Sequence, residues 1–291
     1  MDLLAIALTI GATLSWAFTW LLMKVGVDQM SWIGFGLLRP WMGLPFILLY
    51  ALATGGFGFG SPSVVLVGLS GGLLNAFFGT ALFYYAHRHG SMHETNILAN
   101  TGPFWGVVGA IAILGEPARL VTLGAGALVI GGAYFLVRTR DEGSENRRLR
   151  ALVAALGAGV LWGFSAAVPS KFCIDRGMSP VTYQFLFTCS AAFSWTLAAL
   201  PSLLRRRLTF TRRGVWAALG SSFLGIFAGW VLWLAALQRA DASALSPLQG
   251  LTLLFAVLLG ALFLRKPVTR RVAVGGALIV AGVTLVSLFA R

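Results

Sequence analysis

Long, uninterrupted runs of apolar residues dominate the chain, and only short polar segments separate them. A helix needs about 20 apolar residues to cross the roughly 30 Å hydrocarbon core of a bilayer. The runs are continuous rather than alternating, which excludes a membrane β-barrel. We therefore predict an all-α integral membrane protein with ten transmembrane helices, at residues 3–24, 32–53, 62–87, 92–114, 118–137, 151–171, 180–204, 214–238, 241–264 and 270–290.

Composition and charge narrow the function. Of the 291 residues, 58% are hydrophobic and only 11% are charged. The longest polar stretch, residues 138–150, is too short for a nucleotide-binding or other large soluble module, so ATP-driven transport by this chain alone is not expected. The net charge of +13 comes almost wholly from short loops, where basic residues control topology and contact lipid headgroups. We therefore expect a lipid bilayer and no nucleic acid as partner.

The two halves of the chain repeat each other. Residues 126–133 read Gly-Ala-Leu-Val-Ile-Gly-Gly-Ala, and residues 276–283 read Gly-Ala-Leu-Ile-Val-Ala-Gly-Val. Because each half has an odd number of spans, the second half must enter the membrane with opposite polarity. Such inverted repeats make alternating access possible, since two similar halves can rock about a site near the midplane. We predict a first five-helix repeat at 1–137, a charged linker at 138–150 and a second five-helix repeat at 151–291.

The distribution of basic residues predicts the orientation. Loops after odd-numbered spans contain sixteen lysines and arginines, and the opposite face contains five. Basic loops stay in the cytoplasm, so we predict a multi-pass protein of the cell membrane with both termini extracytoplasmic. The first apolar run follows Met1 and Asp2 directly, without the basic segment of a cleavable signal, and we expect it to be retained.

Several features follow one another in order along the chain: Trp16 and Trp162 in the first span of each half, Arg39 in the second span, a Pro103 to Glu116 stretch that ends the fourth span in Gly-Glu, and glycine-rich fifth and tenth spans. In these features the whole chain resembles the drug/metabolite transporter superfamily, in its EamA-type ten-helix branch. The resemblance implies a central cavity lined chiefly by spans 1, 3, 4, 6, 8 and 9. It also implies transport of small organic molecules, often export of amino acids or other metabolites.

The chain departs from the family pattern at two points. Lys266 stands 150 positions after Glu116, so the charge is reversed in the second half. Many members of the family are described with cytoplasmic termini, whereas the loop charges here place both termini outside.

Aromatic residues lie where a substrate could stack. Trp16 and Trp162 fall within about one turn of the middle of their spans, away from the interfaces where tryptophan normally collects. Trp20 shares a face with Trp16. These rings either pack in the core with each indole N–H bonded to a neighbouring helix, or form a wall against a planar or cationic substrate. Further rings could extend this wall or belong to an interfacial belt: Tyr84, Tyr85, Trp105, Trp230 and Trp233.

A polar stripe follows one face of the fourth span. Asn96 and Asn100 are four residues apart, and His93 lies one turn earlier. An unpaired amide in hydrocarbon costs several kcal/mol, so the stripe must face the protein interior or water. Pro103 removes the hydrogen-bond partner of the Ala99 carbonyl and can loosen the helix there.

The ninth span carries a similar stripe of Ser243, Ser246 and Gln249, with Pro247 alongside. Two polar, proline-interrupted stripes in corresponding spans point to a binding site. Hydrogen bonds between helices that serve packing alone are the alternative. Weaker candidates for the same cavity are Asn75 and Gln184.

Charged and titratable residues inside the spans are few. Arg39 lies well inside the second span, where it either pairs or snorkels for structural reasons or attracts an anionic substrate group such as a carboxylate. Glu94 lies beside His93 in a histidine cluster at the turn between spans 3 and 4, and histidine titrates in a range suited to proton transfer. No acidic residue lies deep in any span, so facilitated diffusion and proton coupling both stay open.

No pattern indicates catalysis: the chain has no metal-ligand spacing, nucleophile elbow or phosphate-binding loop. We expect neither enzyme activity nor a cofactor. Small residues such as Gly126, Gly131 and Gly132 let helices approach closely, for internal packing or at a dimer face, so both a monomer and a homodimer stay open.

Together these features predict a secondary transporter that moves a small organic metabolite by alternating access through a central cavity. We expect an amino acid or related compound of aromatic or zwitterionic character, and the resemblance favours export. An importer of choline or a sugar conjugate is the alternative within transport. A flippase or scramblase of a lipid-linked intermediate is the alternative of another class, and it predicts a lateral opening between helices.

Overall fold

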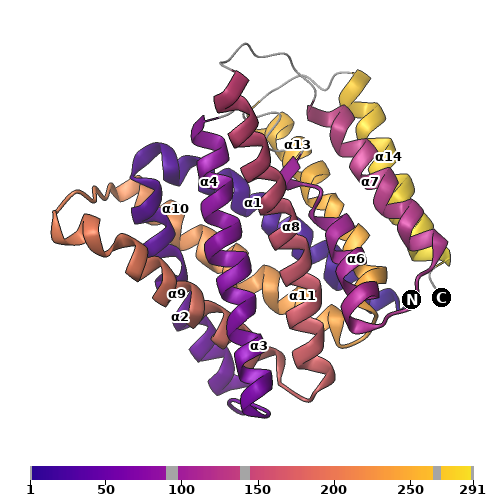
Figure 1. Ribbon diagram of the computed structural model, residues 1–291, viewed down its shortest axis with the longest axis horizontal. Coiled ribbons are helices and arrows are strands. Elements are labelled where there is room, and N and C mark those ends of the chain that lie inside the picture. Colours follow the sequence, from indigo (N-terminus) through magenta and orange to yellow (C-terminus); the bar gives the residue numbers. More distant parts are fainter. Residues whose placement is uncertain (1, 90–97, 138–144, 265–269, 290–291) are drawn as a thin grey trace.

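A computed structural model describes residues 2–89, 98–137, 145–264 and 270–289. Within these ranges the regular structure is entirely helical, and α8 runs through the middle of the bundle (Figure 1). The two termini lie on the same side of the molecule in this view. The first half contains α1 (Leu3–Gln29), α2 (Trp32–Ala53), α3 (Pro62–Gly72), the π-helix η1 (Leu73–Gly79), α4 (Thr80–His89), α6 (Gly102–Leu114) and α7 (Leu120–Val137).

The second half likewise has a π-helix within its third predicted span. It contains α8 (Glu145–Asp175), α9 (Pro180–Leu204), α10 (Arg212–Ser221), the π-helix η2 (Ser222–Ala228), α11 (Gly229–Leu237), α12 (Ala242–Leu245), the 3₁₀-helix η3 (Ser246–Gly250), α13 (Leu251–Leu264) and α14 (Arg270–Phe289). The helix α8 already begins at Glu145, inside the stretch that we predicted as a linker, because its first turns continue the apolar helix beyond the membrane.

Short polar side chains begin several of the helices. The N-cap side chains of Ser31, Ser179 and Thr211 accept hydrogen bonds from backbone N–H groups of α2, α9 and α10. Such caps satisfy donors that a helix end leaves unpaired. They explain why α2 and α9 begin at the residues predicted from hydropathy, 32 and 180.

The protein is a multi-pass membrane protein. Across the described ranges, seven helical segments are long and apolar enough to cross a membrane, and two shorter apolar helices accompany them, Gly102–Leu114 and Leu120–Gly132. Residues 90–97, in the first part of the predicted fourth span, lie outside the description.

Proline interrupts the fourth and ninth predicted spans as expected. Residues 98 and 99 are helical, a turn follows at Asn100 and Thr101, and α6 starts at Gly102 with Pro103 in its first turn. In the second half the short helix α12 gives way to the 3₁₀-helix η3, which contains Pro247, before α13 begins. Both breaks follow from the missing proline N–H and the clash of its ring with the preceding turn.

The two halves are interleaved. The helix α1 packs against α10, α11 and α13 of the second half, and α8 packs against α3, α4 and α6 of the first. At one edge of the bundle α7 and α14 lie side by side (Figure 1).

The contact between α7 and α14 is reciprocal. A Cβ atom at Gly132 would lie 2.6 Å from the Gly275 carbonyl, and one at Gly282 would lie 2.9 Å from the Ala125 carbonyl. Gly132 and Gly282 are 150 positions apart, and so are Ala125 and Gly275. Gly132 therefore serves internal packing, whereas a Cβ atom at Gly131 would have no other atom within 4 Å.

Candidate functional site

A central cavity lies between the two halves and contains about 1070 Å³ of space free of protein atoms, including the part open to the surroundings. Its lining comes from both halves, and spans 2 and 7 contribute beyond the six spans that the resemblance implies. Gly36 of α2 leaves room there for the Trp195 ring of α9, since a Cβ atom at this glycine would lie 2.6 Å from Trp195 Cε3. The predicted residues that line it are Trp16, Trp20, Arg39, Asn75, Asn100, Trp162, Trp230 and Gln249.

The two mid-span tryptophans make equivalent bonds across the interface between the halves. Trp16 on α1 donates from Nε1 to the Gly225 carbonyl of η2, at 3.3 Å. Trp162 on α8 donates from Nε1 to the Asn75 carbonyl of η1, at 3.1 Å. Both rings also line the cavity. The structural role that we considered for these indoles is therefore present, and each ring also packs against other aromatic rings, Trp16 against Trp230 and Trp233 and Trp162 against Phe83.

The two π-helical turns make these bonds possible. A π-helical turn inserts one residue into the α-helical ladder and leaves carbonyl groups displaced from their usual partners. Side chains of neighbouring helices bind these carbonyls: Trp195 Nε1 donates to Ala76 at 2.8 Å, Ser15 Oγ donates to Leu224 at 2.7 Å, and Gln184 Nε2 donates to Phe227 at 3.1 Å. The π-helix η1 is thus held by helices of the second half, and η2 is held by helices of both halves.

Glycines next to these turns admit the indole rings. A Cβ atom at Gly79 would lie 2.6 Å from Trp162 Cδ1, and one at Gly229 would lie 2.5 Å from Trp16 Nε1. The two glycines are 150 positions apart. A larger residue at either position would push the ring toward the cavity.

Asn75 anchors α8 beside the cavity. Its Nδ2 donates to Ser165 Oγ at 2.9 Å and to the Trp162 carbonyl at 3.3 Å. The backbone carbonyl of Asn75 also accepts the hydrogen bond from the Trp162 indole N–H, so Asn75 links η1 to α8 through both its side chain and its backbone. Its position on the cavity surface agrees with its prediction as a candidate binding residue.

Arg39 reaches the cavity from α2 beside the π-helix η2. A Cβ atom at Gly225 would approach its Nη2 atom to 3.2 Å, so the glycine leaves the space that the guanidinium uses. The guanidinium carbon lies 5.8 Å from the centre of the Phe35 ring. Ser222 Oγ donates to the Arg39 carbonyl at 2.8 Å and fixes the backbone of α2 at this point.

The remaining predicted residues have varied positions. Tyr84 is buried and lines a second cavity. Tyr85 is 40% exposed, stacks on His89 with ring centres 4.2 Å apart and lines neither cavity. Ser246, the first residue of η3, is buried and donates to the Ala242 carbonyl of α12. Three predicted residues lie outside the described part of the chain: His93, Glu94 and Asn96.

The second cavity adjoins the first and contains about 1520 Å³ of space, again including the open part. The two cavities share Trp20 and Met23, and the second extends from there along the last turns of α1 to Trp32 and Arg88. The second cavity therefore lies beside the central one, toward the end of the bundle where α1 ends.

The opposite end of the bundle is closed. An apolar cluster fills it and includes Ala5 in the first turn of α1. We call it the closed-end cluster. Its buried aromatic members all come from the second half and are Tyr183, Phe187, Trp230 and Trp233, and Cys173, Leu237 and Leu245 also belong to it.

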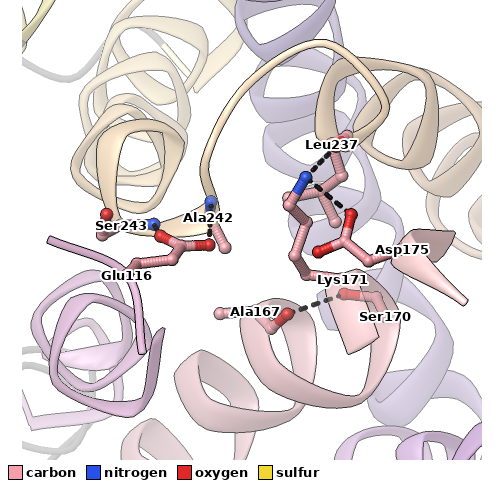
Figure 2. Close-up of polar contacts among 8 residues, drawn as sticks. All are labelled: Glu116, Ala167, Ser170, Lys171, Asp175, Leu237, Ala242 and Ser243. Carbon is pink, nitrogen blue, oxygen red and sulfur yellow. Dashed lines mark hydrogen bonds and ion pairs between the residues drawn. The ribbon is translucent and has the colours of Figure 1, made fainter. Parts of the chain in front are cut away.

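Two groups of polar contacts hold the connection between α11 and α12 against this cluster (Figure 2). Lys171 Nζ donates to the Leu237 carbonyl at the end of α11 and pairs with Asp175 Oδ1, both at 3.0 Å. The Glu116 carboxylate accepts from the backbone N–H groups of Ala242 and Ser243, at 2.9 and 2.7 Å. A carboxylate at a helix N-terminus is favoured by unpaired N–H groups and by the helix dipole.

Sequence reasoning missed part of the lining. Phe187, Ala191 and Trp195 recur every four residues on α9, a spacing that places them on one face of a helix but does not say what that face contacts. The other missed residues, apart from backbone-lining glycines and prolines, are Thr19, Met23, Ala76, Thr80, Ala99, Ala166, Ile226 and Thr252.

Known proteins resemble this chain over nearly its whole length. A sequence model of the EamA-like transporter family matches residues 3–138 and again residues 149–288. The uncharacterized transporter YoaV of Bacillus subtilis (strain 168) is 26% identical over 284 residues, which cover 94% of this chain and 93% of that protein. A solved crystal structure has the same fold, with a TM-score of 0.81 at 18% identity, and covers 99% of this chain and 97% of that one.

Proposed function

Because the chain belongs to the EamA-like transporter family, and so is a membrane transporter of a small substrate, we propose that it is a secondary transporter working by alternating access. In this proposal a small organic metabolite, an amino acid or related compound with an aromatic or zwitterionic character, binds in the central cavity. Export is the favoured direction, because the EamA-type transporters that this chain resembles often export amino acids or other metabolites.

The observation that carries the proposal is the asymmetry of the two ends. A second cavity adjoins the central cavity along the last turns of α1, while the closed-end cluster and its polar contacts occupy the other end. One closed and one open end is what a single state of an alternating-access cycle requires. With the orientation predicted from loop charges, the open end faces the cytoplasm.

Pairs of equivalent contacts support ten helices in two inverted repeats of five. Trp16 and Trp162 bond to π-helices of opposite halves, and Gly132 and Gly282 pack reciprocally. Reciprocal contacts arise when a two-fold axis relates two units. With an odd number of spans in each predicted half, such an axis lies in the membrane plane and gives the halves opposite orientation.

Reconstituted protein is expected to carry a labelled amino acid or related metabolite into liposomes faster than protein-free vesicles do. A panel of amino acids and choline, measured with and without a pH gradient, separates the favoured substrate class from the choline alternative and reveals proton coupling.

Trp16→Ala should lower this flux by about tenfold, equivalent to roughly 1.4 kcal/mol, because it removes both the indole ring and its bond to Gly225. Asn100→Ala should also reduce the flux.

The matched control is Trp216→Ala, since this tryptophan is 62% exposed on the outer surface of the described bundle. It should keep the wild-type flux. All variants are compared at equal amounts of monodisperse protein. Wild-type flux in both Trp16→Ala and Asn100→Ala would remove the cavity from the transport path, and absence of flux for every compound would argue against a metabolite transporter.

The orientation has its own test. A reporter fused after Arg291 should be active on the extracytoplasmic side and inactive in the cytoplasm, because sixteen basic residues lie in the opposite loops. Activity of a cytoplasm-specific reporter at the same position would reverse the orientation and make the described state open to the outside.

A further inference from the structure

Among the described residues, no hydrogen-bond partner is found for three buried polar atoms beside the two cavities: Arg39 Nε, the Tyr84 hydroxyl and Gln249 Nε2. Nearly all buried polar groups in proteins are paired, so each exception requires an explanation. Two of the three are donors only, and the tyrosine hydroxyl can also donate. The cavities therefore offer hydrogen-bond donors that the protein itself leaves unused.

The position of Arg39 is fixed by its surroundings. Gly225 leaves the space beside Nη2, the Phe35 ring lies on one side of the guanidinium, and Ser222 holds the backbone. The Tyr84 hydroxyl lies close enough to the guanidinium for a direct electrostatic interaction. The guanidinium of α2 and the hydroxyl of α4 thus form one donor group, with Arg39 on the lining of the central cavity and Tyr84 on the lining of the second cavity.

The positive charge of Arg39 has no acidic partner among the described residues around it. No aspartate or glutamate appears in the described lining of the central cavity. The lining of the second cavity includes Asp28, which pairs with Lys24 at 3.3 Å. An ionised group inside a membrane protein normally pairs with an opposite charge or with a transported species. The unpaired guanidinium therefore favours an anion as its partner.

We infer that the transported molecule carries one oxyanion group, a carboxylate or a phosphate ester, which binds Arg39 and the Tyr84 hydroxyl. Its aromatic or apolar body then lies against the rings of Trp20 and Trp162, while Gln249 offers a further donor from η3. This inference rests on the proposed function and narrows its substrate class. One guanidinium balances one negative charge, and a planar fork of N–H groups fits two oxygens of one oxyanion.

The inference ranks the chemical groups of a substrate. The anionic group is required, because without it the guanidinium keeps an unpaired charge away from water. An ammonium group is dispensable, since no described acidic residue lies ready to receive it. An aromatic acid without an amine should therefore bind, and an aromatic amine without an acid should not.

Four compounds with one phenyl ring test this ranking: phenylacetate, phenylacetamide, 2-phenylethylamine and phenyl phosphate. Their binding to the purified protein is measured by quenching of tryptophan fluorescence, and their flux is measured in liposomes. We expect phenylacetate or phenyl phosphate to bind about tenfold more tightly than phenylacetamide, and 2-phenylethylamine not to bind. The tighter of the two anions identifies the oxyanion as a carboxylate or a phosphate.

Arg39→Gln should remove this preference for anions and leave the affinity for phenylacetamide unchanged. Arg213→Gln, at an exposed arginine of α10, is the matched control and should keep the preference. If Arg39→Gln does not fold, Tyr84→Phe serves instead, because it removes only the hydroxyl. It should weaken phenylacetate binding about threefold without changing phenylacetamide binding.

Equal binding of phenylacetate and phenylacetamide by the wild type overturns the inference, and so does an anion preference that survives in Arg39→Gln. These outcomes differ from failure of the proposed function. Binding of an anion without flux of any compound would reject transport and keep the anion site. Flux of choline or of 2-phenylethylamine without an anion preference would keep transport and reject the anion site.

Discussion

Gly163→Ala is expected to cost about 3 kcal/mol of stability and to leave little folded protein, because overpacking of a tight contact has no room to relax. A Cβ atom at this position of α8 would lie 1.9 Å from the Gly102 carbonyl oxygen and 2.6 Å from its carbon. Both atoms belong to the backbone, so no side-chain rotation can relieve the collision. Thermal unfolding of the purified protein and its recovery as a monodisperse species measure the effect.

The contact at Gly163 holds the broken fourth span against α8. Gly159, one turn earlier, approaches the same segment, since its Cβ would lie 2.6 Å from the Leu98 carbonyl. The helix ends near Ala99 and restarts at Gly102, and α8 packs directly against this break. Separation of α8 from this break would therefore displace Asn100 and the cavity surface beside it.

Gly124→Ala is the matched control for Gly163→Ala. Gly124 is a helical glycine on α7, and no atom lies within 4 Å of the position that its Cβ would take. The substitution should be neutral or slightly stabilising, because alanine has a higher helix propensity than glycine. Equal unfolding temperatures for Gly163→Ala and the wild type would show that α8 does not approach Gly102 this closely.

Glu116→Ala is expected to open the closed end of the bundle and to raise the population of the alternative state about 30-fold, which corresponds to roughly 2 kcal/mol. The Glu116 carboxylate holds the first two N–H groups of α12, at 2.9 and 2.7 Å (Figure 2). Alanine offers no acceptor, so the connection between α11 and α12 loses one of its attachments. Glu116→Gln keeps an acceptor without the charge and should have an intermediate effect.

Cys173 reports this opening. The residue is fully buried in the closed-end cluster, and a membrane-impermeant maleimide can reach it only when that end opens. In a Cys189→Ser background, Glu116→Ala should raise its labelling rate in proportion to the open population. An unchanged rate would mean that the carboxylate does not hold the closed end.

Arg239→Gln is the control at the same end of the bundle. Arg239 pairs with Asp2 at 3.2 Å, but both side chains are more than 40% exposed. Exposed ion pairs contribute little to stability, so this variant should label at the wild-type rate. A rate as high as that of Glu116→Ala would assign the effect to general loosening of the surface.

The positions of the helices could be predicted well from the sequence. The cost of placing polar backbone and side chains in hydrocarbon fixes where an apolar helix begins and ends, and this cost depends on each segment by itself. The starts of α2 and α9 at 32 and 180 agree with hydropathy for this reason. The breaks beside Pro103 and Pro247 were equally predictable, because proline acts on its own helix.

The site was predicted only in part. Trp16, Trp162 and Asn75 could be predicted as candidates because a large ring or an amide in the middle of a span needs a partner, and all three line the cavity. Tyr85 has the same chemistry as Tyr84 and is its direct neighbour, yet it is exposed while Tyr84 is buried. Adjacent residues point to different sides of a helix, and hydropathy does not distinguish a lipid-facing side from a cavity-facing side.

By itself the sequence determined that the chain is a duplicated helical membrane protein with proline breaks in matching spans, because these properties depend on local composition and on repeated residue order. Only the tertiary structure decided that η1 and η2 are π-helices bound by side chains of both halves, that Glu116 caps α12, and that Arg39 has no acidic partner in the described cavity lining. Each of these depends on residues tens to hundreds of positions apart, and contacts at such separations are fixed by packing of the whole bundle.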